Sequence, residues 1–146
     1  MRIFALTLLV FFSCSHLDTG TEGKVDKILT SPNFEFFTYQ ANCIYPDRAV
    51  LTKDNVENLT FTTAADSSLT VTYKFNNDRE QKIKQIIKKG YNTNTPNDTG
   101  PGNMNRHYWL CSSTDTLHFF NNDADLFDMF LNIGGQSITD DIYKNR

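Results

Sequence analysis

The chain has 146 residues, enough for one domain and short for two, with 14 basic and 17 acidic side chains and a net charge of −3. This mild acidity argues against nucleic acid or an anionic membrane surface as the partner. Length and net charge therefore favour a small single-domain protein whose partner is neither nucleic acid nor a membrane surface.

The N-terminal residues 1–15, MRIFALTLLVFFSCS, have the organisation of a secretory signal peptide. Arg2 precedes a nearly unbroken apolar run over residues 3–12, and small residues follow it. The run is too short to span a bilayer, which needs about 20 residues. We expect a secreted, extracellular domain over residues 16–146, with no membrane partner after cleavage. An N-terminal membrane anchor and a lipoprotein with a lipidated Cys14 are the alternatives.

Cysteines and glycosylation sequons both fit an exported chain. After removal of the signal peptide only Cys43 and Cys111 remain, and an oxidising compartment favours one disulfide between them. Such a bond closes a loop of 67 residues and contributes about 4 kcal/mol. Two unpaired thiols, or a bond to another chain, are the alternatives. Sequons begin at Asn58 and Asn97, so the protein is a candidate glycoprotein.

The first half of the chain reads mainly as strands. Residues 24–29 (KVDKIL) have apolar residues at helical spacing, and residues 33–40 (NFEFFTYQ) form an expected strand with aromatic residues on both faces. Residues 57–63 (ENLTFTT) and 67–75 (SSLTVTYKF) alternate apolar and polar residues around a turn. The latter two predict an antiparallel hairpin.

The second half of the chain mixes clear and ambiguous patterns. Residues 79–91 (REQKIKQIIKKGY) fit either a helix or a strand, and residues 92–105 are a loop rich in Asn, Pro and Gly. Residues 106–111 (RHYWLC) and 114–120 (TDTLHFF) are expected strands. Residues 126–133 (LFDMFLNI) alternate in a way that we interpret as a final amphipathic strand.

Six to eight short strands with regular turns, and at most one or two short helices, predict an all-β fold. An antiparallel barrel or a β-sandwich is the expected architecture, and the barrel is preferred because closure removes the exposed edges of a sheet.

The sequence offers little that indicates catalysis, so the protein is not expected to be an enzyme. His107 and His118 lie on separate expected strands without metal-binding spacing, and no metal or cofactor is predicted. The acidic residues Asp123, Asp125 and Asp128 lack the pattern of a calcium-binding loop. A small secreted enzyme is the third alternative, after a carrier of a small ligand and a protein that binds another protein.

Aromatic residues are the main surplus. Outside the signal peptide the chain has nine Phe, six Tyr and one Trp, mostly along expected strands. An aromatic core explains more than half of them. The functional interpretation is an aromatic-lined cavity that binds a small apolar or amine ligand.

The order of these features resembles the lipocalins of tick and related arthropod saliva, the histamine-binding branch. The resemblance covers about residues 25–133 and rests on VDKIL, the strand FEFFTY, the cysteine-bearing strand and hairpin from NCIYPDRAV to TVTYKF, and the acidic turn before LFDMFLNI. The chain departs from the family in three ways. It lacks the Gly-x-Trp signature, it has DMF where the family has a Glu-Leu-Trp-like triplet, and it lacks the C-terminal cysteines that usually bond to a residue like Cys43.

The resemblance implies a lipocalin-like calycin barrel, secreted in saliva, that sequesters a biogenic amine such as histamine, or a lipid mediator. Host proteins are a further class of partner in that family. The expected ligand-binding residues, with Asp128 as the internal carboxylate, are Phe36, Tyr39, Phe61, Tyr73, Phe75, Trp109, Phe127 and Asp128. Plain core packing is the alternative for each ring, as an outward face is for Asp128. The alternative function is a secreted β-sandwich that binds another protein.

Overall fold

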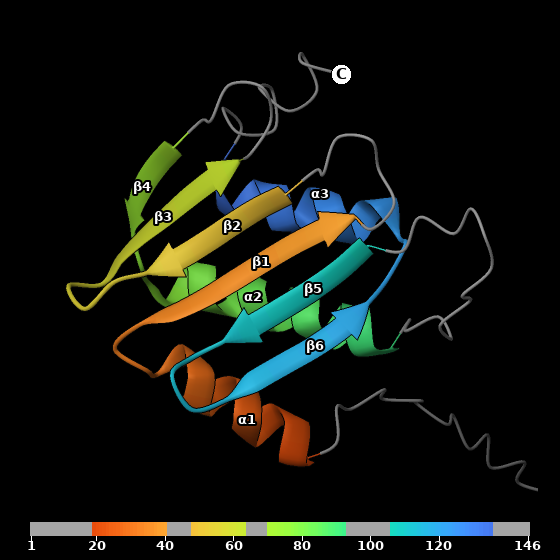
Figure 1. The fold of residues 1–146 in the computed structure, drawn as a ribbon, viewed down its shortest axis with the longest axis horizontal. Helices are drawn as coiled ribbons and strands as arrows, with labels where there is room; N and C mark the ends of the chain where they lie inside the picture. Colours follow the sequence, from red (N-terminus) through yellow and green to blue (C-terminus); the bar gives the residue numbers. More distant parts are fainter. Residues whose placement is uncertain (1–18, 41–47, 64–69, 93–105, 136–146) are drawn as a thin grey trace, which may run out of the picture.

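The computed structural model describes residues 19–40, 48–63, 70–92 and 106–135. The predicted signal peptide and the polar C-terminal residues 136–146 lie outside them. Within them the chain forms three helices and six strands (Figure 1), in the order α1 (Thr19–Leu29), β1 (Phe34–Gln40), β2 (Arg48–Lys53), β3 (Asn58–Thr63), β4 (Thr70–Lys74), α2 (Asn77–Asn92), β5 (Arg106–Cys111), β6 (Thr116–Phe120) and α3 (Ala124–Ile133). No helix of this described part is both long and apolar enough to cross a membrane.

The six strands form one antiparallel sheet in the order β4-β3-β2-β1-β5-β6. The first four strands follow one another as a meander, and the predicted β3–β4 hairpin is confirmed. The β5–β6 hairpin then pairs with β1, which places β1 inside the sheet. An antiparallel sheet was the expected element, but it does not close into a barrel, and the predicted all-β barrel is not confirmed.

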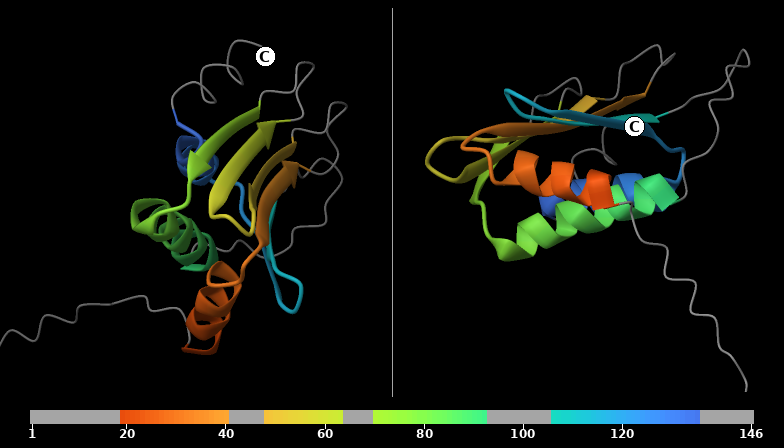
Figure 2. Two further views of the ribbon diagram at one scale, coloured as in Figure 1. Left: turned by 90° about the vertical axis from the view of Figure 1, so that its left-hand side faces the viewer. Right: turned by 90° about the horizontal axis from the view of Figure 1, so that it is seen from below.

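The architecture is a mixed α/β arrangement in two layers. All three helices lie on one face of the sheet, which we call the covered face, as the edge-on view in Figure 2 shows. The opposite face, toward the viewer in Figure 1, carries none of these helices, and we call it the open face. Every strand therefore presents alternate side chains to the two faces.

The hydrophobic core fills the space between the covered face and the helices. Strand residues at alternating positions supply one side of it, and Phe36, Leu51 and Phe61 have no exposed surface. The helices supply the other side through residues spaced by three or four positions, among them Ile28, Ile83, Ile86, Leu126 and Phe130. Burial of these apolar surfaces is the main stabilising term of the fold.

The predicted final strand is wrong, because residues 126–133 lie in α3. The side chain of Asp123 caps this helix by accepting a hydrogen bond from the backbone N–H of Asp125, at 2.9 Å. Buried residues then recur at helical spacing: Leu126, Phe127, Phe130, Leu131 and Ile133. The sequence of residues 126–133 also fits an apolar period of two, but the capping residue Asp123 and the pairs of adjacent apolar residues favour a helix.

The ambiguous segment at 79–91 forms the greater part of α2, an amphipathic helix. Ile83, Ile86, Ile87 and Gly90 are buried on one face. The charged face carries an i,i+4 ion pair between Lys82 and Asp78, at 3.0 Å. With α2 and α3 both helical, the two segments that would have extended the sheet toward closure instead cover one of its faces.

Candidate functional site

The eight residues expected to line one cavity are divided between the two faces of the sheet. Phe36 and Phe61 are completely buried on the covered face, and Phe127 is buried on α3. Tyr39 and Trp109 are half-buried on the open face, on neighbouring strands. The prediction that these rings share one cavity is therefore wrong, because residues an odd number of positions apart on a strand point to opposite faces.

The other three expected site residues lie at the margins of the core. The hydroxyl of Tyr73 donates a hydrogen bond to the backbone oxygen of Gly134 after α3, and the ring lies 4.7 Å from the Arg79 guanidinium. Phe75 packs edge-on against Phe34, with ring centroids 5.5 Å apart. Asp128 is half-buried on α3. Tyr73 and Phe75 therefore contribute to packing between the sheet and the helices.

Two parallel rows of rings cross the open face on β1, β5 and β6, and we call these six side chains the ring array. The members of each row are direct cross-strand partners. The first row contains Phe37, Trp109 and His118; the second contains Tyr39, His107 and Phe120. All six side chains are half-buried. Cross-strand aromatic pairs of this kind stabilise a sheet by about 0.2–1 kcal/mol each.

Most neighbouring rings within a row are close to parallel, but Phe120 is tilted by 58° against His107. The Trp109 and His118 rings stack with centroids 3.9 Å apart at an interplanar angle of 21°. Phe37 and Trp109 are nearly parallel at 6.2 Å, and Tyr39 and His107 are nearly parallel at 5.1 Å. The indole N–H of Trp109 is covered and has no acceptor among the described groups. The array is thus packed from side to side along both rows.

His107 and His118 join the two rows. His107 Nδ1 and His118 Nε2 are 3.0 Å apart, and the two ring planes differ by only 4°. Because stacked atoms lie at least about 3.5 Å apart, this shorter distance means that the rings meet edge to edge in an N–H···N hydrogen bond. Burial lowers the pKa of both imidazoles, and the proximity of His107 lowers the pKa of His118 further. At neutral pH the pair is therefore uncharged.

One basic and one acidic side chain lie beside the array on the same face. The exposed Arg48 on β2 holds its guanidinium 5.4 Å from the centre of the Phe37 ring. Glu35 lies at the opposite end of β1, across from Cys111 in the row next to Trp109. The ring array therefore has a cation at one end and a carboxylate at the other.

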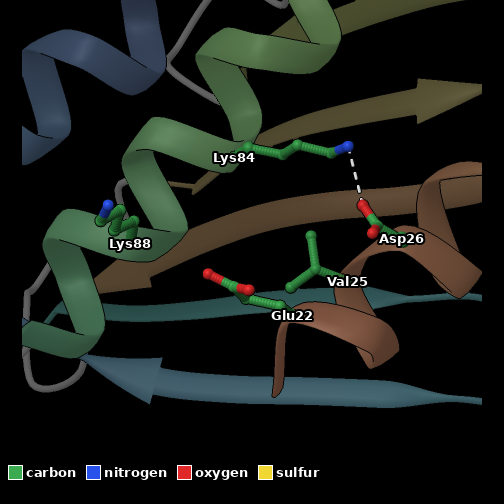
Figure 3. Close-up of a pocket in the computed structure, with 5 residues that line it drawn as sticks. All are labelled: Glu22, Val25, Asp26, Lys84 and Lys88. Atoms are coloured by element: carbon green, nitrogen blue, oxygen red, sulfur yellow. Dashed lines mark ion pairs between the residues drawn. The ribbon is translucent and has the colours of Figure 1, made fainter. Parts of the chain in front are cut away.

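A cavity of about 220 Å³ opens elsewhere, between α1 and α2 (Figure 3). Glu22, Val25, Asp26, Lys84 and Lys88 line it, and none of them was expected to bind a ligand. Lys84 forms ion pairs with Asp26 and with Glu80, both at 2.7 Å. The cavity is therefore a charged groove between two helices, and it lacks the aromatic lining that a lipocalin-like carrier needs.

Cys111 carries a free thiol in this structure, and Cys43 lies outside the described residues. Cys111 ends β5 and pairs with Glu35 of β1. The disulfide between Cys43 and Cys111 stays a prediction.

The glycosylation predictions fall on one described and one undescribed residue. Asn58 begins β3, and its amide nitrogen donates a hydrogen bond to Asp54 at 3.1 Å. Asn97 lies outside the described residues. The described part of the chain contains no group of three or more His, Cys, Asp or Glu side chains that could hold a metal ion. Glycosylation at Asn58 and Asn97 and the absence of a bound metal both stay predictions.

Four members of the ring array were missed from the sequence. Phe37, His107, His118 and Phe120 were absent from the expected site, because the histidines were considered only as metal ligands. The signal was nevertheless present, since two short strands separated by a turn over residues 112–115 form a hairpin that sets His107 near His118. No family model matches the chain, and no curated protein matches it either, so the lipocalin resemblance stays a prediction.

Proposed function

We propose that the chain is a secreted, non-enzymatic protein that binds another protein through the ring array on the open face. The observation that carries this proposal is the pair of cross-strand ring rows on the sheet face opposite the three described helices. Six half-buried rings on three neighbouring strands form one continuous surface. Contiguous apolar surfaces of this kind are typical of interaction sites.

The composition of the array supports a protein partner. Tryptophan, tyrosine and arginine are the residues most enriched among those that dominate the binding energy of protein interfaces. The array brings together Tyr39 and the only tryptophan of the chain, Trp109, with Arg48 beside them. Rings already held against one another lose little side-chain entropy when a partner covers them.

The position of the ring array on one face of a sheet also favours a protein over a small ligand. Pockets for small ligands bury about 70–90% of the ligand surface, which requires a concave site. A sheet face contacts a ligand from one side only. Carriage of an amine or lipid inside a barrel, the first expectation from the sequence, stays a prediction that needs a closed cavity which the six described strands do not form.

Electrostatics indicate the chemistry of the partner surface. At neutral pH the ring array itself carries no charge, and Arg48 is exposed at its β2 side. A complementary surface presents apolar or aromatic side chains to the rings and a carboxylate to the guanidinium, since such a pair forms a charge-assisted hydrogen bond. The expected epitope is therefore apolar with an acidic residue near its edge.

Trp109 provides a direct test, because it is the only tryptophan and lies within the array. We would select binders from a displayed random-peptide library against the full secreted chain at neutral pH. We expect selected peptides to be rich in aromatic and acidic residues, to change Trp109 emission, and to protect it from acrylamide quenching. A parallel thermal-shift screen against biogenic amines and fatty acids tests the carrier alternative.

Two variants separate binding at the array from binding elsewhere. Phe37→Ser on the open face should weaken peptide binding by about tenfold or more, the cost typical of an important interface residue. Val56→Ser is the matched control, because Val56 is 65% exposed and lies in the β2–β3 turn. Peptides that bind the Phe37→Ser and Val56→Ser variants equally well would overturn the proposal. So would a thermal-shift screen in which amines or lipids raise the melting temperature while no peptide binds.

A further inference from the structure

The two histidines of the ring array share one hydrogen bond that can be formed in only some protonation states. His107 Nδ1 and His118 Nε2 face each other at 3.0 Å. An N–H···N bond needs one protonated and one bare nitrogen. The neutral pair satisfies this, and so does a pair with one extra proton. A doubly protonated pair places two N–H groups and two positive charges against each other.

Aromatic rings surround this pair, and among the described residues no carboxylate lies adjacent to it. The His118 ring stacks on Trp109, and the His107 ring lies parallel to Tyr39, 5.1 Å away. From the covered side, the Tyr91 hydroxyl of α2 donates to the backbone oxygen of His118 at 3.3 Å. The histidine side chains therefore meet apolar ring faces and each other.

The ionisable groups on neighbouring strands do not compensate a charge on the pair. On the open face and the β5–β6 turn these groups are Glu35, Tyr39, Arg48, Cys111 and Asp115. Asp115 forms an ion pair with Lys27 at 2.8 Å, and Glu35 lies one row beyond Trp109, away from His107. Arg48, on the strand next to Tyr39, has the same sign as an imidazolium. Burial accordingly lowers the pKa of both histidines.

We propose that the His107–His118 pair makes this surface pH-sensitive, so that the protein holds its partner at neutral pH and releases it in mildly acidic surroundings. This inference rests on the proposed function of the ring array. In the complex the pair is covered by an apolar partner, which removes the remaining water from it. A proton that the free protein accepts is then costly to accommodate, because a buried charge without a counter-ion is strongly unfavourable.

The sign of the effect follows from linkage. Covering the pair lowers its pKa below the value in the free protein, so the free protein binds more protons than the complex in the window between the two values. Affinity is therefore fully present above the pKa of the free pair and falls as the pH drops through it. Because histidine ordinarily titrates near 6.5 and burial lowers the pKa of both residues, this window lies on the acidic side of pH 6.5.

The first experiment concerns the free protein and needs no partner. Protonated imidazole quenches a stacked indole, so Trp109 emission reports the charge on His118. We expect emission to fall only below the ordinary histidine range, and side-chain NMR spectra to show both histidines titrating together. The conservative variant His118→Gln, which stays neutral and keeps a hydrogen-bonding group, should abolish the change in emission. Two independent, ordinary histidine titrations would overturn the inference.

The second experiment measures the affinity for the tightest peptide from the selection above. We expect affinity to fall at least about tenfold between about pH 7.5 and about pH 5, since one unit of pKa difference between the free and bound states corresponds to a factor of ten. His118→Gln should bind with nearly constant affinity over that range. Substitution at an exposed site, Val56→Ser, should keep the wild-type pH dependence.

The outcomes separate the two proposals. If a peptide binds the array but its affinity is the same at both pH values, the pH-sensitive release fails and the binding function stands. If His118→Gln loses affinity with the same pH profile as the wild type, the pair acts only in packing, and the release inference also fails. If no peptide binds the array at neutral pH, both proposals are overturned.

Discussion

The covered face and the open face of the sheet both carry aromatic side chains on neighbouring strands, but they use them differently. On the covered face Phe36 and Phe61 meet the Phe130 ring of α3 at 4.9 and 5.7 Å, and all three are completely buried. On the open face the rings contact one another in rows and stay half-buried. Rings that pack against another layer stabilise the fold, whereas rings that pack only sideways keep surface available for a partner.

The largest expected effect tests this difference directly. Phe130→Ala removes a ring that contacts three others, Phe36, Phe61 and Tyr108, and should lower the free energy of unfolding by about 3–5 kcal/mol. Phe37→Ala on the open face loses mainly a cross-strand contact with Trp109 and should cost only about 1 kcal/mol. Urea unfolding of both variants measures the contrast. Equal losses would show that the open face is part of the core.

A pair of glycines sharpens the comparison for the helix layer. A Cβ atom at Gly90 on α2 would overlap the Phe119 ring of the covered face, lying 2.7 Å from Cδ2 and 2.9 Å from Cζ. Gly90→Ala should therefore cost about 1–3 kcal/mol through overpacking, despite the better helix propensity of alanine. Gly23→Ala on α1 is the matched control, since a Cβ there meets nothing within 4 Å.

The control glycine should respond in the opposite direction. Gly23→Ala should raise the free energy of unfolding by up to about 1 kcal/mol, the difference in helix propensity. Thermal or urea unfolding of the two alanine variants measures both signs. A stabilising Gly90→Ala would mean that α2 lies further from Phe119 than the structure shows.

The smallest expected effect is the pH dependence of folding that the histidine pair contributes. Burial lowers the pKa of His107 and His118 in the folded state, so the unfolded chain binds more protons below the ordinary value of 6.5. Stability from the pair is therefore present above pH 6.5 and declines as the pH falls toward the lowered values. His118→Gln should flatten the dependence in urea unfolding at several pH values, and an unchanged slope would contradict it.

Much of the sheet could be predicted from the sequence because its strands alternate clearly. Residues 33–40, 57–63, 67–75, 106–111 and 114–120 were all expected strands, and β1, β3, β4, β5 and β6 lie within them. Their order in the sheet could not be predicted, since pairing between β1 and β5 depends on contacts between residues about 70 positions apart. Local periodicity contains no information on such distant pairing.

The expected strand over residues 126–133 was wrong for a physical reason, whereas residues 79–91 had been left open between a helix and a strand. In residues 126–133 the apolar positions 127, 129, 131 and 133 alternate, while the adjacent apolar pairs 126–127 and 130–131 recur four positions apart. The segment therefore satisfies both a period of two and a helical period. Asp123 as a cap and the absence of β-branched residues before Ile133 were the deciding local signals. Without the final strand the barrel expectation had no basis.

The candidate site could be predicted only in part. Tyr39 and Trp109 were expected to bind a ligand, and the structure places both in the ring array. The error was to combine them with Phe36, although Phe36 and Tyr39 are three positions apart on one strand and must face opposite sides. His107 and His118 required knowledge of the β5–β6 register, which sets the two rows beside each other.

An open sheet also has an unfinished hydrogen-bond ladder. Within the described residues β6 pairs on one side only, with β5, and its other side is the edge next to the ring array. A foreign strand that joined this edge would lengthen both ring rows, because its side chains would continue the lines that end at His118 and Phe120. Any strand that extends the sheet at β6 would therefore also extend the ring array.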